Sequence, residues 1–481
     1  MSLADTAARG GAVTLAGQLA RFIMQLASVA ILARLIDPTD YGLFTMVFAI
    51  VGVASVIGDF GLSLAAIQSQ NITPQQRTNL FWTNTAIGIA LGILVVLGAP
   101  ALAEFYGVPA VTPIAQVMAI TFLLNALTAQ FRAEVSIKLR FSWLAVIDVL
   151  AVAVALGLAI GIAVSGGGYW ALVAQQLVIA AVSLIGLALA ARWLPGLPRR
   201  GAHMRELYAF GANTLGVQLF SYATSNVDSI LIGRVWGTMP LGIYDRAYQL
   251  FRLPLQQIAA PMTKVAMPIL SKLQADDRYE AYVRRAQMVL GYTFGGTFWL
   301  LAALSDPIVD ILLGPGWGQA KPIFTVLAVG GVFQAIGFVY YWVFLSLALT
   351  GLQLRWTVIG RSTMVACMAV GVIWGPLGVA IGSTIGQAIN WSLQTTFPMS
   401  KTGLRRAPLI AIALRPIALF APVSIVCVVV SYTVMSAWNP WTQLAVLVPT
   451  LCAYFAVASL VPSVRSDYSH LLAVAQRLRR R

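Results

Sequence analysis

Charged residues are scarce in this chain. Aspartate, glutamate, lysine and arginine make up 10% of its 481 residues, whereas soluble proteins carry about 25%. Hydrophobic residues make up 59%, and the mean hydropathy is +0.83. A charge deficit this large along the whole chain excludes a soluble globular protein, because only lipid tolerates so apolar a surface. We therefore expect an integral membrane protein.

Cysteine and histidine are rarer still. Cys367, Cys427 and Cys452 fall in apolar runs, and His203 and His470 fall in basic connecting segments. This distribution predicts neither a disulfide framework nor a metal site. No phosphate-binding loop, dinucleotide fingerprint or zinc-protease motif occurs, so no cofactor and no ATP site are expected. The first residues, MSLADTAARGG, do not resemble a removable signal peptide.

Long apolar runs, in contrast, fill the chain. A run of about 20 apolar residues can cross a bilayer as a helix. We find fourteen such runs: 11–34, 41–68, 78–103, 112–131, 141–164, 168–191, 209–233, 241–268, 286–305, 322–349, 356–374, 377–398, 409–435 and 442–461. The sequence therefore predicts an all-α, polytopic membrane protein with about fourteen transmembrane helices.

The basic residues predict the orientation of these helices. With both termini inside, 22 of the 31 lysines and arginines fall in inner segments and three in outer segments. Such a bias is the mark of cytoplasmic loops. It also accounts for the net charge of +15 without a nucleic-acid partner. The C-terminal RLRRR is expected to contact anionic membrane lipid.

A shift of 200 positions aligns the chain with itself. GAVTLAGQL (11–19) then lies over GANTLGVQL (211–219), and Gly42 meets Gly242. We infer two six-helix bundles of the same orientation around a central cavity, an arrangement found in secondary transporters. The expected parts are an N-terminal bundle (1–200), a C-terminal bundle (201–400), two extra helices (401–464) and a basic cytoplasmic tail (465–481).

Polar residues form a stripe along three of the expected helices. At about 100° per residue, they share one face of each helix. In the first span they are Thr14, Gln18, Arg21, Gln25 and Ser28; in the seventh Thr214, Gln218, Ser221, Ser225 and Asp228; in the eighth Arg246, Gln249, Arg252, Gln256, Gln257 and Lys264.

Charges facing lipid cost several kcal/mol each, so these stripes must face protein or water. A hydrated cavity is one interpretation, and a network of helix–helix hydrogen bonds is the other. Cations outnumber acids within the spans, which favours an anionic substrate, and arginine suits phosphate. The substrate-binding candidates are Arg21, Arg246, Arg252, Lys264, Arg361, Gln18, Gln25, Gln218, Gln249 and Gln256. The candidates for ion coupling are Asp228, Asp59, Asp148 and Asp245, with structural pairing as the alternative for each.

Several segments resemble one known family. They are LARLIDPTDYGLFTMVFAIVGVASVIGDFGLSLAAIQ, RTNLFWTN, GYWALVAQQL, IGRVWGTMPLGIYDRAYQLFRLP, MPILSKLQ and LLGPGWGQA. Their order and spacing, from residue 10 to about 400, are similar to those of Wzx-type polysaccharide and O-antigen flippases. These belong to the multidrug/oligosaccharidyl-lipid/polysaccharide exporter superfamily.

The resemblance implies a function that the residues alone do not. It implies a V-shaped cleft in a bacterial inner membrane, and alternating access that moves undecaprenyl-pyrophosphate-linked repeat units outward. It also implies a role in O-antigen, capsule or exopolysaccharide synthesis, with a polysaccharide polymerase and chain-length machinery as partners. No short motif transfers binding residues one by one.

Three alternatives stay open at this point. A lipid II flippase or a multidrug antiporter would belong to the same superfamily. A membrane glycosyltransferase or polymer ligase would need acids on an outer loop, where Asp37 and Asp40 of DPTDYG lie. That segment reads more simply as a helix-capping turn. The outer segment 306–321 is expected to lie flat at the interface or re-enter the membrane, with Trp317 as an interfacial anchor.

Overall fold

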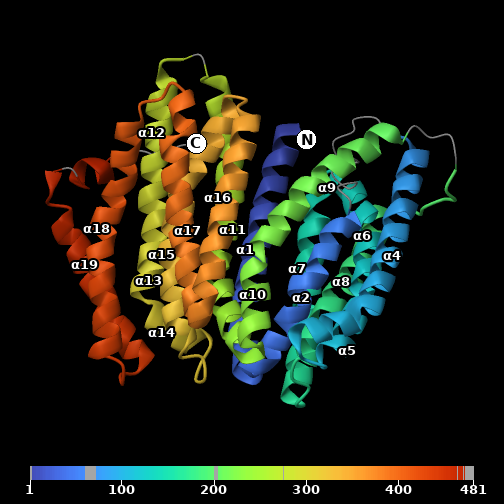
Figure 1. Ribbon diagram of the computed structural model, residues 1–481. Helices are drawn as coiled ribbons and strands as arrows, with labels where there is room; N and C mark the ends of the chain where they lie inside the picture. The colour runs from blue at the N-terminus through green and yellow to red at the C-terminus, as the bar shows by residue number, and fades with distance from the viewer. Residues whose placement is uncertain are drawn as a thin grey trace. The chain divides into compact units, whose positions relative to one another are not determined.

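A computed structural model describes residues 3–59, 72–199, 204–274, 276–462, 464–469 and 471 (Figure 1). All regular structure in these ranges is helical, which confirms the all-α expectation. The chain divides into two compact units, Met1–Asp245 and Arg246–Arg481, with the boundary inside helix α11. The expected grouping at residues 1–200, 201–400, 401–464 and 465–481 stays a prediction.

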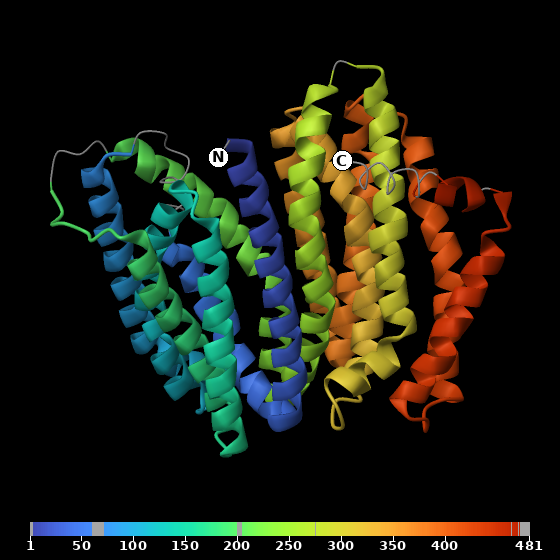
Figure 2. The same cartoon turned by 180° about the vertical axis from the view of Figure 1, so that it is seen from behind.

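The first unit consists of α1 (Leu3–Leu35), α2 (Pro38–Asp59), α4 (Pro74–Tyr106), α5 (Val111–Met118), α6 (Ile120–Ile137), α7 (Phe141–Val164), α8 (Trp170–Ala191), α9 (Arg205–Ser225), α10 (Val227–Trp236) and the start of α11 (Thr238–Lys272). Helix α7 packs between α1 and α8, and α6 packs between α8 and α4. Figure 2 shows the same helices from behind. Phe81, Phe131 and Ile147 belong to the apolar core that joins α4, α6, α7 and α8.

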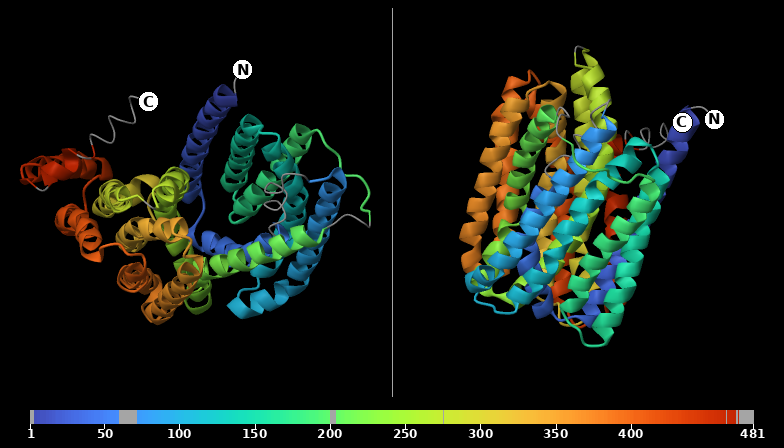
Figure 3. Two further views of the ribbon diagram at one scale, coloured as in Figure 1. Left: turned by 90° about the horizontal axis from the view of Figure 1, so that it is seen from above. Right: turned by 90° about the vertical axis from the view of Figure 1, so that its right-hand side faces the viewer.

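The second unit continues α11 and adds α12 (Arg278–Leu290), a π-helical turn (Gly291–Gly295), α13 (Gly296–Ala303), α14 (Ser305–Leu312), α15 (Ala320–Ser346), α16 (Thr350–Gly371), α17 (Gly375–Thr396), α18 (Arg406–Thr433) and α19 (Pro440–Ala458). Short 3₁₀ turns lie at Val372–Trp374 and Pro398–Lys401. Helix α15 is central, because α12, α13, α14, α16 and α17 all contact it. Helices α18 and α19 pack on α12, α13 and α14, and Figure 3 shows them together at the rim of this unit.

Large apolar side chains cover the outside of the helices. Leu97, Val164 and Leu189 are each at least 70% exposed. In water such a surface would cause aggregation, whereas helices with internally satisfied backbones present it readily to lipid. The protein is therefore a multi-pass membrane protein.

Nine helical stretches of the described residues are long and apolar enough to span a membrane, or ten if one bent pair forms a single span. One of the nine, Thr350–Lys401, contains α16 and α17, which pack against each other as a hairpin. Helices α9, α10 and α11 do not pass this test, and they carry two of the predicted polar stripes. The expected second span, 41–68, ends beyond the described residues. The count of fourteen stays a prediction.

The expected seventh span, 209–233, is broken in the structure. Helix α9 ends at Ser225, and α10 begins at Val227. The side-chain amide of Asn226 donates to the carbonyl of Tyr222 (2.9 Å), which satisfies one of the acceptors left at the end of α9. Non-helical backbone within a membrane-spanning segment is tolerated only where it is buried in protein or lines a water-filled cavity, because its polar groups must be satisfied.

The N-terminal turns of α2 and α11 make a reciprocal contact inside the first unit. A Cβ on Gly42 would overlap the carbonyl oxygen of Thr238, and a Cβ on Gly242 would overlap that of Pro38. Each residue and its counterpart are separated by the shift of 200 positions. Two copies related by a two-fold axis would make such a contact, which supports the internal repeat; the repeat itself stays a prediction.

The segment 306–321 starts with α14, which is bent by 74° from the preceding helix Arg278–Ala303. The sequence predicts that this segment lies flat at the interface or re-enters the membrane, and the bend leaves that prediction open, because it is compatible with a broken span or a re-entrant loop. Trp317, however, is only 1% exposed. The expectation of an interfacial anchor at Trp317 is wrong, because the indole packs inside the protein instead of facing the lipid headgroups.

Candidate anion-binding residues

Arg21 lies beside a second arginine and a shared carboxylate. Arg132, on α6, donates two hydrogen bonds to Asp148 on α7, from Nη2 to Oδ1 (2.7 Å) and from Nη1 to Oδ2 (3.3 Å). Arg21, on α1, pairs with the same Oδ2 at 3.6 Å. The side chains of Arg21 and Arg132 are 49% and 42% exposed, and that of Asp148 is 22% exposed. The cluster therefore combines two cations with one anion and keeps both cations accessible.

Sequence reasoning named Arg21 and Asp148 but missed Arg132, which it assigned to an inner connecting segment. The position of Asp148 inside an apolar run was a signal, because an aspartate within a membrane span needs a polar or charged partner or contact with water. The sequence does not identify Arg132 as that partner, because the pairing depends on which faces of α6 and α7 meet.

A second cluster in this unit also has two cations around one carboxylate, and this carboxylate is more deeply buried than Asp148. Glu134, only 2% exposed, pairs with Arg77 (2.7 Å) and Lys138 (2.8 Å). Lys138 also donates to the carbonyl of Ala191 at the end of α8 (3.0 Å). Cations near the C-terminus of a helix stabilise its dipole. These basic residues of the predicted inner loops thus hold helix ends together.

The stripe on α1 is only partly free for a ligand. Gln18 is exposed and Gln25 is half-buried. Ser28 accepts a hydrogen bond from the side-chain amide of Gln175 on α8 (2.9 Å). For Ser28, the structure therefore supports the interpretation of helix–helix hydrogen bonding. Gln218, on α9, is half-buried.

Asp228 is engaged within its own unit. It is 5% exposed, and its carboxylate accepts from the hydroxyl of Tyr244 (2.9 Å) and from the backbone amide of Ser229 (2.8 Å). Its position in the first turn of α10 also places a negative charge at the positive end of that helix. These contacts favour a structural role over ion coupling.

The remaining candidates lie mainly on α11 and α16. Arg246 is buried (9% exposed), Arg252 is exposed, and Gln249, Asp245 and Arg361 are half-buried. None of Arg246, Arg252, Arg361 and Asp245 is without an interaction partner. The side chains of Asp59, Gln256 and Lys264 lie outside the described residues.

The candidates thus fall in two separate units. Arg21, Asp148, Gln218 and Asp228 belong to the first, whereas Arg246, Arg252 and Arg361 belong to the second. A single cavity shared by the stripes therefore stays a prediction.

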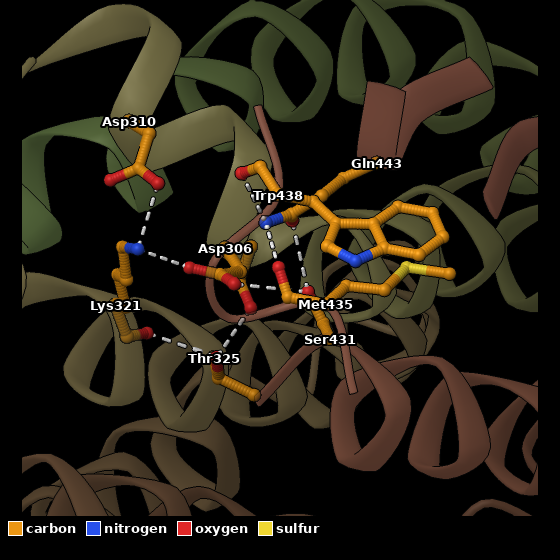
Figure 4. Close-up of polar contacts among 9 residues, drawn as sticks. Asp306, Asp310, Lys321, Thr325, Ser431, Met435, Trp438 and Gln443 are labelled. Carbon is orange, nitrogen blue, oxygen red and sulfur yellow. Dashed lines mark hydrogen bonds and ion pairs between the residues drawn. The ribbon is translucent and has the colours of Figure 1, made fainter. Parts of the chain in front are cut away.

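A further polar cluster links α14, α15, α18 and α19 (Figure 4). Lys321 contacts both Asp306 and, at 2.8 Å, Asp310. Ser431 donates to Asp306 (3.1 Å), and its hydroxyl also contacts the side-chain oxygen of Gln443 (3.2 Å). Asp306 is 3% exposed. Sequence reasoning missed this cluster, because it placed Lys321 in the outer segment 306–321 and named no partner for it.

Asp40 of the DPTDYG segment is engaged by another connecting segment of the same unit. The carboxylate of Asp40 packs against Gly168 and accepts from the backbone of Tyr169 in the turn between α7 and α8. A Cβ at residue 168 would collide with this carboxylate, and the backbone there has φ +52. Burial and the neighbouring Asp37 raise the pKa of Asp40, while the Tyr169 bond opposes that rise. Asp40 therefore joins the first turn of α2 to the turn between α7 and α8.

Among the described residues, no group of three or more histidine, cysteine, aspartate or glutamate side chains could hold a metal ion.

Comparison with known proteins relates this chain to proteins of polysaccharide biosynthesis. A family model described as "Polysaccharide biosynthesis protein" matches residues 31–322. The chain is 27% identical over 318 residues to the teichuronic acid biosynthesis protein TuaB of Bacillus subtilis, covering 65% of this chain and 66% of TuaB. It is 24% identical over 373 residues to the lipopolysaccharide biosynthesis protein WzxC of Escherichia coli, covering 76% of this chain and 75% of WzxC.

The fold is similar to that of a solved transporter. The lipid II flippase MurJ, in an inward closed conformation, matches with a TM-score of 0.71 and 13% identity. The match covers 93% of this chain and 98% of the MurJ chain. At this identity the likeness concerns the fold alone.

Proposed function

Because the chain belongs to the polysaccharide biosynthesis protein family, we propose that it is a flippase for lipid-linked oligosaccharides. The cargo is an undecaprenyl-pyrophosphate-linked repeat unit, moved from the inner to the outer leaflet by alternating access. The family match over residues 31–322 is the observation that carries this proposal.

The proposed setting is a bacterial inner membrane with both termini in the cytoplasm. The distribution of lysine and arginine supports this orientation. A polysaccharide polymerase and its chain-length machinery are the proposed partners, because they would consume the exported unit.

The physics of the cargo supports the direction of transport. A pyrophosphate headgroup carries about two negative charges, and outward movement across an inside-negative membrane releases about 2.3 kcal/mol per charge per 100 mV. Arg21 and Arg132, both about half exposed, offer guanidinium groups to such a headgroup.

One rival has an observation in its favour. The chain shares the fold of the lipid II flippase MurJ, and a lipid II flippase would carry a cargo that is also a pyrophosphate-linked sugar, so we keep it as the second proposal. A multidrug antiporter is less well supported, since basic residues outnumber acids within the expected spans. A strain that lacks surface polymer separates the first two proposals, because only a repeat-unit flippase restores the polymer.

The test of the proposed function uses Arg21→Ala and Arg252→Ala. Each variant is expressed in a strain deleted for the native chain, and surface polymer is measured against membrane content of the variant. Removing one charge-assisted contact to the headgroup is expected to lower export about tenfold, while the protein still inserts.

Arg278→Ala is the matched control. Arg278, which is 78% exposed, is the first residue of α12 and pairs with Asp276 two residues before it (2.6 Å). Its removal is expected to leave export unchanged. Wild-type export from both Arg21→Ala and Arg252→Ala would refute the assigned binding residues.

A further inference from the structure

Asp148 holds two guanidinium groups that belong to different helices. Arg132 binds both carboxylate oxygens from α6, and Arg21 approaches Oδ2 from α1. A carboxylate and a phosphate present similar oxygen pairs to a guanidinium fork. The two arginines that hold the Asp148 carboxylate are thus positioned to bind a phosphate group in its place.

The charges of this cluster do not balance. Two cations and one anion leave an excess of one positive charge, and both arginines are between 40% and 50% exposed. Charged groups exposed within a membrane protein face water or another polar partner, because lipid contact costs several kcal/mol. The cluster is therefore open to an incoming anion.

Two members of the cluster, Arg132 and Asp148, lie near one end of α6 and α7, whereas Arg21 lies near the middle of α1. Arg132 is five residues before the end of α6, and Asp148 is seven residues after the start of α7. At 1.5 Å per residue, these positions lie about 8 Å and 11 Å from the helix ends. In the proposed orientation these are the inner ends, at the depth where a headgroup of the inner leaflet enters.

We propose that Arg132 and Arg21 form a loading site for a phosphate group of the substrate, and that Asp148 occupies this site until the substrate displaces it. This inference rests on the proposed function and adds to it a binding residue, Arg132, and a resident counter-ion, Asp148. The carboxylate keeps the two guanidinium groups close together against their mutual repulsion. The incoming phosphate then takes over the same hydrogen-bond donors.

The Glu134 cluster shows what a purely structural group of this kind looks like. It also has two cations around one carboxylate, but Glu134 is 2% exposed and Arg77 is 19% exposed. One of its cations, Lys138, is engaged by a helix end as well. Lys138 itself is 37% exposed, but the carboxylate that it shares with Arg77 is enclosed, whereas Asp148 is 22% exposed and can be replaced by an entering anion.

The test measures binding of inorganic pyrophosphate to the purified full-length protein by titration calorimetry. Arg132→Gln keeps hydrogen-bond donors but removes the charge, and is expected to weaken binding about tenfold. Arg132→Lys keeps the charge but loses the fork, and is expected to fall between Arg132→Gln and the wild type. Asp148→Asn removes the competing anion and is expected to bind pyrophosphate several-fold more tightly than the wild type.

Glu134→Gln is the control, expected to lower the melting temperature without changing pyrophosphate affinity. Wild-type affinity in Arg132→Gln would overturn the loading site, and unchanged or weaker binding in Asp148→Asn would overturn the displacement by substrate. A wild-type protein that exports polymer but binds no pyrophosphate would overturn this inference alone. A wild-type protein that neither binds pyrophosphate nor exports polymer would overturn the proposed function.

Discussion

Several charged side chains in this protein are held by partners on other helices. Asp306 illustrates the energetics, because a carboxylate that is 3% exposed has lost nearly all contact with solvent. Lys321 and Ser431, from two other helices, replace that solvent. Breaking a buried ion pair leaves the other charge uncompensated, which costs far more than the intact pair contributes.

This reasoning predicts different outcomes for two neighbouring aspartates. Asp306→Asn is expected to destabilise the protein by about 3 kcal/mol, because Lys321 then stays partly buried with one partner fewer. Asp310→Asn, whose side chain is 31% exposed, is expected to cost less than about 1 kcal/mol. Thermal unfolding of both variants in detergent measures the difference, and equal losses would show that burial does not control the contribution of this cluster.

At the scale of elements, close helix approach depends on small residues. Helices α16 and α17 form a hairpin in which a Cβ on Gly382 would overlap the carbonyl oxygen of Cys367. Association of helices in lipid relies on such backbone-to-backbone packing, because apolar side chains gain little by leaving lipid.

Gly382→Ala is therefore expected to separate α16 from α17 and to destabilise the protein by about 1–3 kcal/mol, as overpacking does. Gly351, at the start of α16, has open space around it. Gly351→Ala is thus expected to leave the melting temperature unchanged or slightly raised. A melting temperature of Gly382→Ala equal to that of the wild type would exclude tight packing of this hairpin.

At the scale of the whole molecule, the proposed orientation makes a prediction about access from the two sides of the membrane. Gly196 and Gly318 lie in exposed connecting segments, the first with several arginines nearby. In a chain whose three cysteines are replaced by alanine, Gly318→Cys is expected to react with a membrane-impermeant maleimide added to intact cells. Gly196→Cys is expected to react only after permeabilisation.

Reaction of both cysteines after permeabilisation is the internal control for this experiment. Labelling of Gly196→Cys in intact cells would reverse the proposed orientation. It would also place the Arg132 cluster at the outer rather than the inner leaflet.

The sequence by itself determined the class of this protein and the kind of residue that matters in it. A chain with 10% charged residues must live in lipid, and lipid permits helices because each satisfies its own backbone. By the same physics, Arg21, Asp148 and Asp228 had to face protein or water.

Only the tertiary structure decided which partner each of these residues meets. It placed Arg132 on Asp148, Tyr244 on Asp228 and Lys321 on Asp306, and it broke the seventh span at Asn226. Partner choice depends on how these successive helices are rotated and packed against one another. Helical periodicity predicts which face of a helix carries a charge, but it does not predict which neighbouring helix that face contacts.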